Sequence, residues 1–120
     1  MEISHYQLNP SVTIGKLEEI GFKHGGWMSN IKEPKMSYIR PLVKDIELCI
    51  EINIDTFEFD DEENVFIWDD NFGQAYYPFY TKSEIDFAVK VKRAYNDKMD
   101  SLVDEGLLER TGVKVKKKTM

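Results

Sequence analysis

Asp and Glu are the residues of this sequence that are numerous and closely spaced enough to form a chemically active site. Residues 45–80 contain eleven Asp or Glu and no Lys or Arg. Closely spaced carboxylates can bind a divalent cation, act as general acid and base in hydrolysis, or recognise a cationic partner. These three chemistries are the alternatives to weigh for this stretch.

The spacing of the acids does not match a calcium-binding loop. An EF-hand loop requires Gly at the sixth and Glu at the twelfth of its twelve positions. A loop that starts at Asp69 has Gly73 at the fifth position and Tyr80 at the twelfth, and one that starts at Asp60 has no Gly in place. We therefore predict no metal site and no cofactor, with weak adventitious binding of a divalent ion as the alternative.

Catalysis also lacks the residues it needs. General acid–base work requires a carboxyl group with a tuned pKa, which exposed loop acids rarely have, and residues 45–80 offer no cation to position a substrate. Cys49 lies between Glu47 and Glu51 on one face of a predicted strand, and two carboxylates raise the pKa of a thiol. The two histidines, His5 and His24, do not fall in a triad pattern. We predict no catalytic residues and a protein that is not an enzyme, with a small metal-dependent hydrolase as an alternative.

Recognition of a cationic surface is the chemistry that remains. Seven of the acids lie at the two ends of one predicted hairpin, and a run of tyrosines, which are common interface anchors, follows them. The predicted partner-binding residues are Glu58, Asp60, Asp61, Glu62, Glu63, Asp69, Asp70, Tyr76, Tyr77 and Tyr80. We expect them to contact a Lys- and Arg-rich surface in the manner of a nucleic-acid mimic, and a solvated polar face is the alternative.

Charge and length define the setting of this stretch. The chain has 120 residues and a net charge of −6, divided into +2 over residues 1–44, −11 over residues 45–80 and +3 over residues 82–120. We expect no direct contact of the acidic middle with nucleic acid. The single Cys, the absence of a signal peptide and the absence of an ~18-residue apolar run favour a cytoplasmic protein without a membrane segment.

The element that must position these acids is a strand at 46–54. Ile46, Leu48, Ile50, Ile52 and Ile54 alternate with polar residues, which predicts one face in a core and one face in water. Phe57 and Phe59 have the opposite parity, which predicts a turn or bulge near Asp55 and Thr56.

Other elements are indicated by turn formers and helical spacing. We predict a helix at 11–20 capped by Ser11, strands at 27–31, 36–43 and 65–68, and an extended segment at 76–80. In that segment Tyr76 and Tyr80 would share one face and Tyr77 and Phe79 the other, with one pair in the core.

The helix at 83–105 should begin at a capping box and end at Gly106. Its expected buried stripe consists of Ile85, Ala88, Val89, Tyr95, Met99, Leu102 and Val103, widened by Phe87, Val91 and Ala94. The predicted fold is a single α+β domain over residues 1–120: an antiparallel sheet of three to five strands packed against one long C-terminal helix, with a short N-terminal helix and a flexible basic tail at 111–120.

The stretches LEEIGFKHGGWM, IELCIEINIDTFEF and VFIWDDNFGQAYYPFY carry a family likeness. Together they resemble small acidic proteins encoded by phages and prophages of Gram-positive bacteria, over most of residues 14–108. Some such proteins, anti-CRISPR proteins among them, inhibit host defence by stoichiometric binding without catalysis. The resemblance implies a non-catalytic inhibitor that occupies a basic, nucleic-acid-binding surface of a host protein such as a defence nuclease. A structural protein that self-associates through its aromatic segment, as a homodimer for example, is the alternative.

Overall fold

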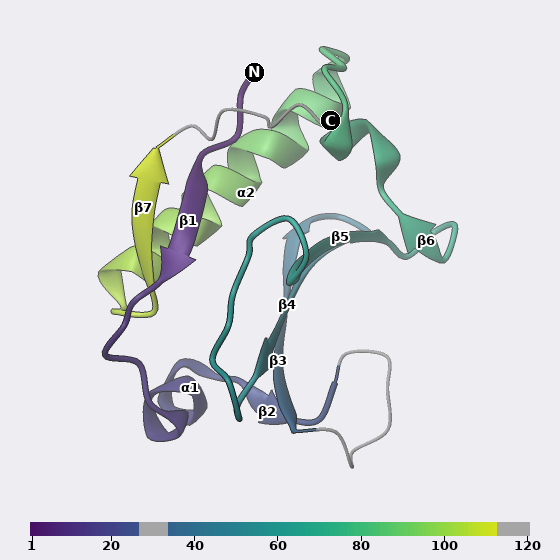
Figure 1. Ribbon diagram of the computed structural model, residues 1–120. Coiled ribbons are helices and arrows are strands. Elements are labelled where there is room, and N and C mark those ends of the chain that lie inside the picture. Colours follow the sequence, from purple (N-terminus) through teal and green to yellow (C-terminus); the bar gives the residue numbers. More distant parts are fainter. Residues whose placement is uncertain (27–33, 113–120) are drawn as a thin grey trace, which may run out of the picture.

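The computed structural model of this chain describes residues 1–26 and 34–112 (Figure 1). Its elements are β1 (His5–Leu8), α1 (Ile14–Ile20), β2 (Lys23–His24), β3 (Lys35–Val43), β4 (Ile46–Asn53), β5 (Val65–Asp69), β6 (Gln74–Ala75), the 3-10 helix η1 (Tyr77–Tyr80), α2 (Asp86–Asp104) and β7 (Leu108–Gly112). The predicted strand at 27–31 and the tail from residue 113 lie outside the described residues. The tail was predicted to start at residue 111, but residues 111 and 112 still belong to β7.

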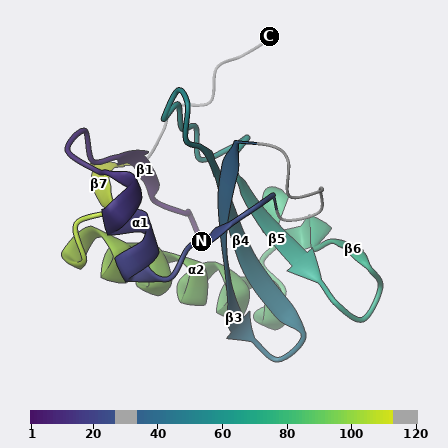
Figure 2. The ribbon, with the colours of Figure 1, turned by 90° about the horizontal axis from the view of Figure 1, so that it is seen from below.

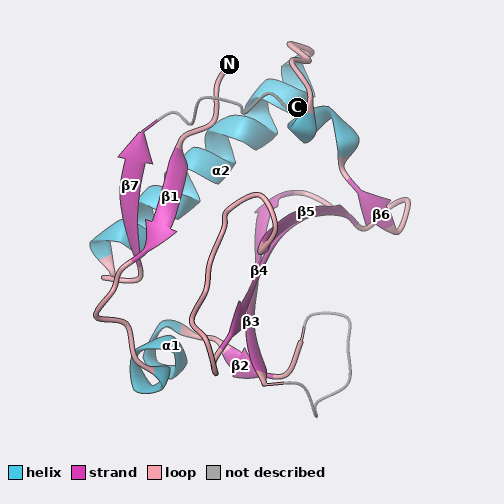
Figure 3. Ribbon diagram, in the orientation of Figure 1, coloured by secondary structure: helices cyan, strands magenta, loops and turns pink. Residues whose placement is uncertain are grey.

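The predicted α+β fold is confirmed. Five antiparallel strands form one sheet in the order β2-β3-β4-β5-β6, and α2 lies across its apolar face (Figures 2 and 3). The central strand β4 pairs Cys49 with Ile39 of β3 and Leu48 with Ile67 of β5. The hairpin that carries the acids therefore lies in the middle of the sheet.

The alternation in β4 follows the predicted pattern. Its even-numbered residues are buried: Ile46, Leu48, Ile50 and Ile52. Glu47 and Glu51 on the other face are half-buried. Cys49 is the exception on that outer face, because Ile39 and Phe66 lie directly beside it in the register and bury it fully.

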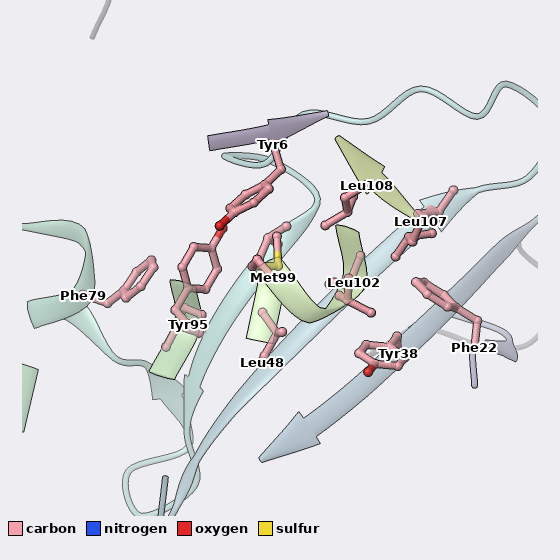
Figure 4. Close-up of a cluster of buried hydrophobic side chains, with 14 of the residues drawn as sticks. Tyr6, Phe22, Tyr38, Leu48, Phe79, Tyr95, Met99, Leu102, Leu107 and Leu108 are labelled. Atoms are coloured by element: carbon pink, nitrogen blue, oxygen red, sulfur yellow. The ribbon is translucent and has the colours of Figure 1, made fainter. Parts of the chain in front are cut away.

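A second sheet of two strands, β1 and β7, was not predicted. Its strands are four and five residues long and pair antiparallel, with Tyr6 opposite Arg110 and Leu8 opposite Leu108. They lie about a hundred positions apart in the chain, so no local hairpin signal marks them. Figure 4 shows Tyr6 and Leu108 from this sheet above Met99 and Leu102 of α2, with Leu48 of β4 below them. The helix therefore packs against both sheets, and all three contribute to one core.

The first helix starts later than predicted. Thr13, and not Ser11, is its N-cap, because the Thr13 hydroxyl accepts the Lys16 N–H at 3.1 Å. Ser11 instead donates to the side chain of Asn9. The end of the helix at Gly21 is confirmed, since this residue has a φ of 125°, which glycine adopts without a steric penalty.

The long helix α2 also starts later, at Asp86. The predicted capping box is wrong, since its N-cap is Ile85, which has no capping side chain. The buried Lys92 explains the delay: its ammonium donates to the carbonyls of Thr81 at 2.8 Å and Ser83 at 3.1 Å, which holds residues 81–85 in a non-helical connector. Ile85 and Phe87, predicted to be buried, are exposed.

The segment at 76–80 is not extended as predicted. Residues 77–80 form η1, and the only strand here is the two-residue β6. A 3-10 helix repeats every three residues, so Tyr76 and Phe79 share the buried side while Tyr77 and Tyr80 are exposed. The predicted face pairs, based on a period of two, are wrong for this reason.

Candidate functional site

The acidic loop, residues 54–64, connects β4 to β5 and contains five of the predicted partner-binding residues. Its first turn is built by Asn53, whose side-chain oxygen accepts the N–H groups of Asp55 at 2.8 Å and Thr56 at 3.2 Å. Phe57 then adopts a left-handed φ of 55° and donates its N–H to the Asn53 carbonyl. The predicted turn at Asp55 and Thr56 is confirmed.

The second turn of the acidic loop is fixed by Asp60 and Asn64. The Asp60 side chain accepts the Glu62 N–H at 2.7 Å, and the Asn64 side chain accepts the Asp60 N–H at 2.7 Å. Asn64 also donates its amide to the carbonyl of Glu51 in β4. The loop therefore has a defined backbone in spite of its length, because most of its turns are hydrogen-bonded.

Side chains of the acidic loop divide into an inner and an outer set. Phe57 and Phe59 pack against the core and Asp61 is buried. The exposed set consists of Asp55, Thr56, Glu58, Asp60, Glu62 and Glu63. Figure 1 shows the loop running between β1 and β4. Its inner residues contact both sides, since Phe57 and Phe59 pack against the core and Asp61 accepts the N–H of Tyr6 in β1.

A hollow of about 310 Å³ lies beside this loop. Three carboxylates line it, with one aromatic ring and three neutral polar side chains: Glu58, Asp60, Glu63, Phe59, Asn53, Thr56 and Asn64. Within the part of the chain that the structure describes, no Lys, Arg or His lines it. Carboxylates around a small concavity with an aromatic wall suit a guanidinium or ammonium group, which they can bind through charge-assisted hydrogen bonds and a cation–π contact.

Asp61 is not a surface residue, contrary to the prediction. Its side chain is 1% exposed. It accepts the backbone N–H of Tyr6 at 2.8 Å and contacts Nδ1 of His5 at 3.1 Å. Because a carboxylate only accepts hydrogen bonds, Nδ1 of His5 carries the proton in this contact. Asp61 thus attaches the acidic loop to the open edge of β1, a structural role across 55 residues that the sequence does not reveal.

The acids at the end of β5, Asp69 and Asp70, form a separate group. Asp69 is buried, and its side chain accepts the Asn71 N–H at 2.9 Å, which shapes the turn into β6. Asp70 is exposed. Asp69 lies five strand positions beyond Asn64, the last residue of the acidic loop, which corresponds to about 17 Å. The structure therefore does not bring the seven predicted acids together on one surface.

The predicted tyrosines also have different roles. Tyr76 is buried against Phe87, with ring centroids 5.7 Å apart. The Tyr80 hydroxyl accepts the N–H of Ile67 at 2.9 Å. This backbone donor of β5 has no partner in β6, because β6 pairs only with Trp68 and Asp69. Burial raises the pKa of Tyr80. Tyr77 is 60% exposed, and of the three tyrosines it is the most accessible to a partner.

The pKa of the Cys49 thiol is raised, as its neighbouring carboxylates predict, and burial contributes more to this rise than any one of the carboxylates does. Burial, with Glu47 and other acids nearby, raises the pKa of the Cys49 thiol to about 12. The thiol is therefore protonated near neutral pH. Labelling with a thiol reagent at pH 7.5 is expected to be at least ~100-fold slower for the native chain than for the chain unfolded in guanidinium. Fast labelling without denaturant would contradict the burial of this residue.

Within residues 1–26 and 34–112, no group of three or more His, Cys, Asp or Glu side chains is placed to hold a metal ion. In the same part of the chain, no helix is long and apolar enough to cross a membrane.

Comparisons with known proteins give a likeness in fold. No family model matches the chain, and no curated protein gives a significant match. The fold is similar to that of a DUF1831 family protein from Lactobacillus plantarum, seen in a crystal structure, with a TM-score of 0.61 over 88% of this chain and 85% of the other. The sequence identity is 18%, so the likeness shows a shared α+β fold and carries no activity to this chain.

Proposed function

We propose that this chain is a non-catalytic binding protein whose acidic loop takes up Lys or Arg side chains from a basic surface of a partner protein. The hollow lined by Glu58, Asp60 and Glu63 is the observation that supports this best. The hydrogen-bonded backbone of the loop loses little conformational freedom on binding, which favours affinity.

The partner proposed here is a host protein with a nucleic-acid-binding surface, such as a defence nuclease. Such surfaces concentrate Lys and Arg to neutralise phosphates. The resemblance of residues 14–108 to small acidic phage and prophage proteins supports this setting. The net charge of −6 would also speed the encounter with a basic partner at low salt.

A fluorescent hexa-arginine peptide tests the proposal by anisotropy at 50 and 300 mM NaCl. Glu58→Gln, Asp60→Asn and Glu63→Gln together remove three charges, while Asn at position 60 keeps a side-chain oxygen for the Glu62 N–H. Because exposed charge pairs contribute about 0.5–1 kcal/mol each, we expect the triple variant to bind roughly tenfold or more weakly at 50 mM NaCl.

A matched control removes the same charge elsewhere. Asp97→Asn, Asp104→Asn and Glu105→Gln neutralise three exposed acids in and just after α2. We expect this variant to bind the peptide nearly as well as the unaltered chain. Equal losses in both variants would mean that net charge alone, and not the hollow, binds the peptide, and the proposal would then be wrong.

A further inference from the structure

A second exposed feature lies apart from the acidic loop, where η1 meets α2. Four large apolar side chains are exposed there within eleven residues. They form what we call the aromatic corner: Tyr77 (60% exposed), Tyr80 (47%), Ile85 (58%) and Phe87 (41%). Figure 1 places η1 and the start of α2 at the end of the molecule that is distant from α1 and β2.

The backbone under the aromatic corner is held in place. Phe87 packs edge-on against the buried Tyr76, and the ring of Tyr80 lies edge-on to the buried Phe79 at 5.2 Å. The connector between η1 and α2 is bound by the Lys92 ammonium through two carbonyls. The exposed apolar side chains are thus presented on a preorganised surface, which lowers the entropic cost of covering them.

The charges around this corner differ from those of the acidic middle of the chain, residues 45–80. The exposed charged residues from 82 to 93 are three cations and two anions: Lys82, Lys90, Arg93, Glu84 and Asp86. A surface that meets its own copy across a two-fold axis must be self-complementary. An apolar centre with nearly balanced charges meets this condition, whereas the acidic loop would repel its own copy.

The exposed area sets the expected strength of such a contact. An aromatic side chain presents ~150–250 Å², so four large side chains that are about half exposed present on the order of 400 Å² per copy. A standard stable interface buries about 800 Å² per partner. The aromatic corner therefore suits only a weak, reversible dimer.

We infer that a second copy of this chain covers the aromatic corner in a two-fold contact. This inference goes beyond the proposed function and does not depend on it. The dimer would place two acidic loops on one particle, which raises the effective affinity for a basic surface that can reach both.

Sedimentation equilibrium of the full chain from 10 µM to 1 mM, at 50 and 500 mM NaCl, tests the inference. The mass is expected to rise with concentration from 14.1 kDa toward twice that value. Two chains of net charge −6 repel each other, so higher salt should strengthen the dimer. Binding of the hexa-arginine peptide should weaken as the salt concentration rises, whereas dimerisation should strengthen. These opposite salt dependences distinguish peptide binding by the acidic loop from dimerisation at the aromatic corner.

The variant Tyr77→Ser with Ile85→Ser is expected to weaken dimerisation at least tenfold. Its folding should be preserved, because Ile85 already has the extended backbone of an N-cap and serine is favoured there. Ile14→Ser, at an exposed apolar residue of α1, is the control that should still dimerise. A constant mass of 14.1 kDa up to 1 mM at both salt concentrations would overturn the inference, as would self-association that the double variant leaves intact.

Discussion

Replacing Asp61 by Ala is expected to lower the free energy of unfolding by about 2–3 kcal/mol. The buried carboxylate accepts the Tyr6 N–H and the proton on His5 Nδ1, so its removal leaves a backbone donor at the edge of β1 without its acceptor. A chain of this size should then unfold about 10 °C lower. Thermal denaturation followed by circular dichroism measures this shift.

The neighbouring acid provides the control for this result. Glu62 is exposed, and Glu62→Ala is expected to change the unfolding free energy by less than about 0.5 kcal/mol. Equal effects of the two substitutions would contradict the division of the loop into inner and outer acids. Asp61→Asn keeps an acceptor for Tyr6 and should recover part of the loss.

Leu48→Ala is expected to have the largest effect on stability, a loss of about 3 kcal/mol or more. Leu48 is fully buried at the centre of β4, in the core that Met99 and Leu102 of α2 also line (Figure 4). The substitution removes apolar contacts and leaves a cavity that the closely packed interior fills only in part. Urea unfolding monitored by fluorescence gives the change in free energy.

Glu47→Ala is the matched control on the opposite face of the same strand. Burial, and then Asp70, raises the pKa of Glu47, so the fold disfavours the ionised form of this carboxyl. A raised pKa in the folded state means that this acid lowers stability at neutral pH. Glu47→Ala should therefore be close to neutral, within about 0.5 kcal/mol. A large loss at Glu47 and a small one at Leu48 would reverse the assignment of the two faces.

Local patterns predicted much of the fold. The alternation in β4 is a direct consequence of strand geometry, so its inner face could be predicted from the sequence. The glycines at 21 and 106 end their helices because both adopt positive φ values. These features depend on neighbours within a few residues.

Features that depend on distant contacts were not predictable. The pairing of β1 with β7 and the contact of Asp61 with Tyr6 join segments far apart in the sequence. Lys92 is a partial exception, since it lies on the same helical face as Ala88 and Tyr95 and could have been assigned to the buried side. Residues 77–80 form a 3-10 turn, in which side chains share a face every three residues and not every two. Tyr76 therefore shares its face with Phe79, and not with Tyr80 as predicted.

The candidate site was predicted only in part, because it too depends on contacts between distant residues. Sequence spacing identified the acidic stretch, but tertiary contacts decide which acids are exposed. Asp61, Asp69 and Tyr76 are buried, whereas Glu58, Asp60 and Glu63 line one hollow. The surface proposed to bind a partner is therefore smaller than the predicted set of ten residues.

Nuclear magnetic resonance of the ¹⁵N-labelled chain tests the central claim most directly. Titration with hexa-arginine at 50 mM NaCl is predicted to shift the backbone amides of residues 53–64, while the amides of Asp70, Asp97 and Asp104 change little. This pattern would place cation binding at the hollow of the acidic loop. Shifts spread over all acidic surfaces, or concentrated outside residues 53–64, would contradict the account.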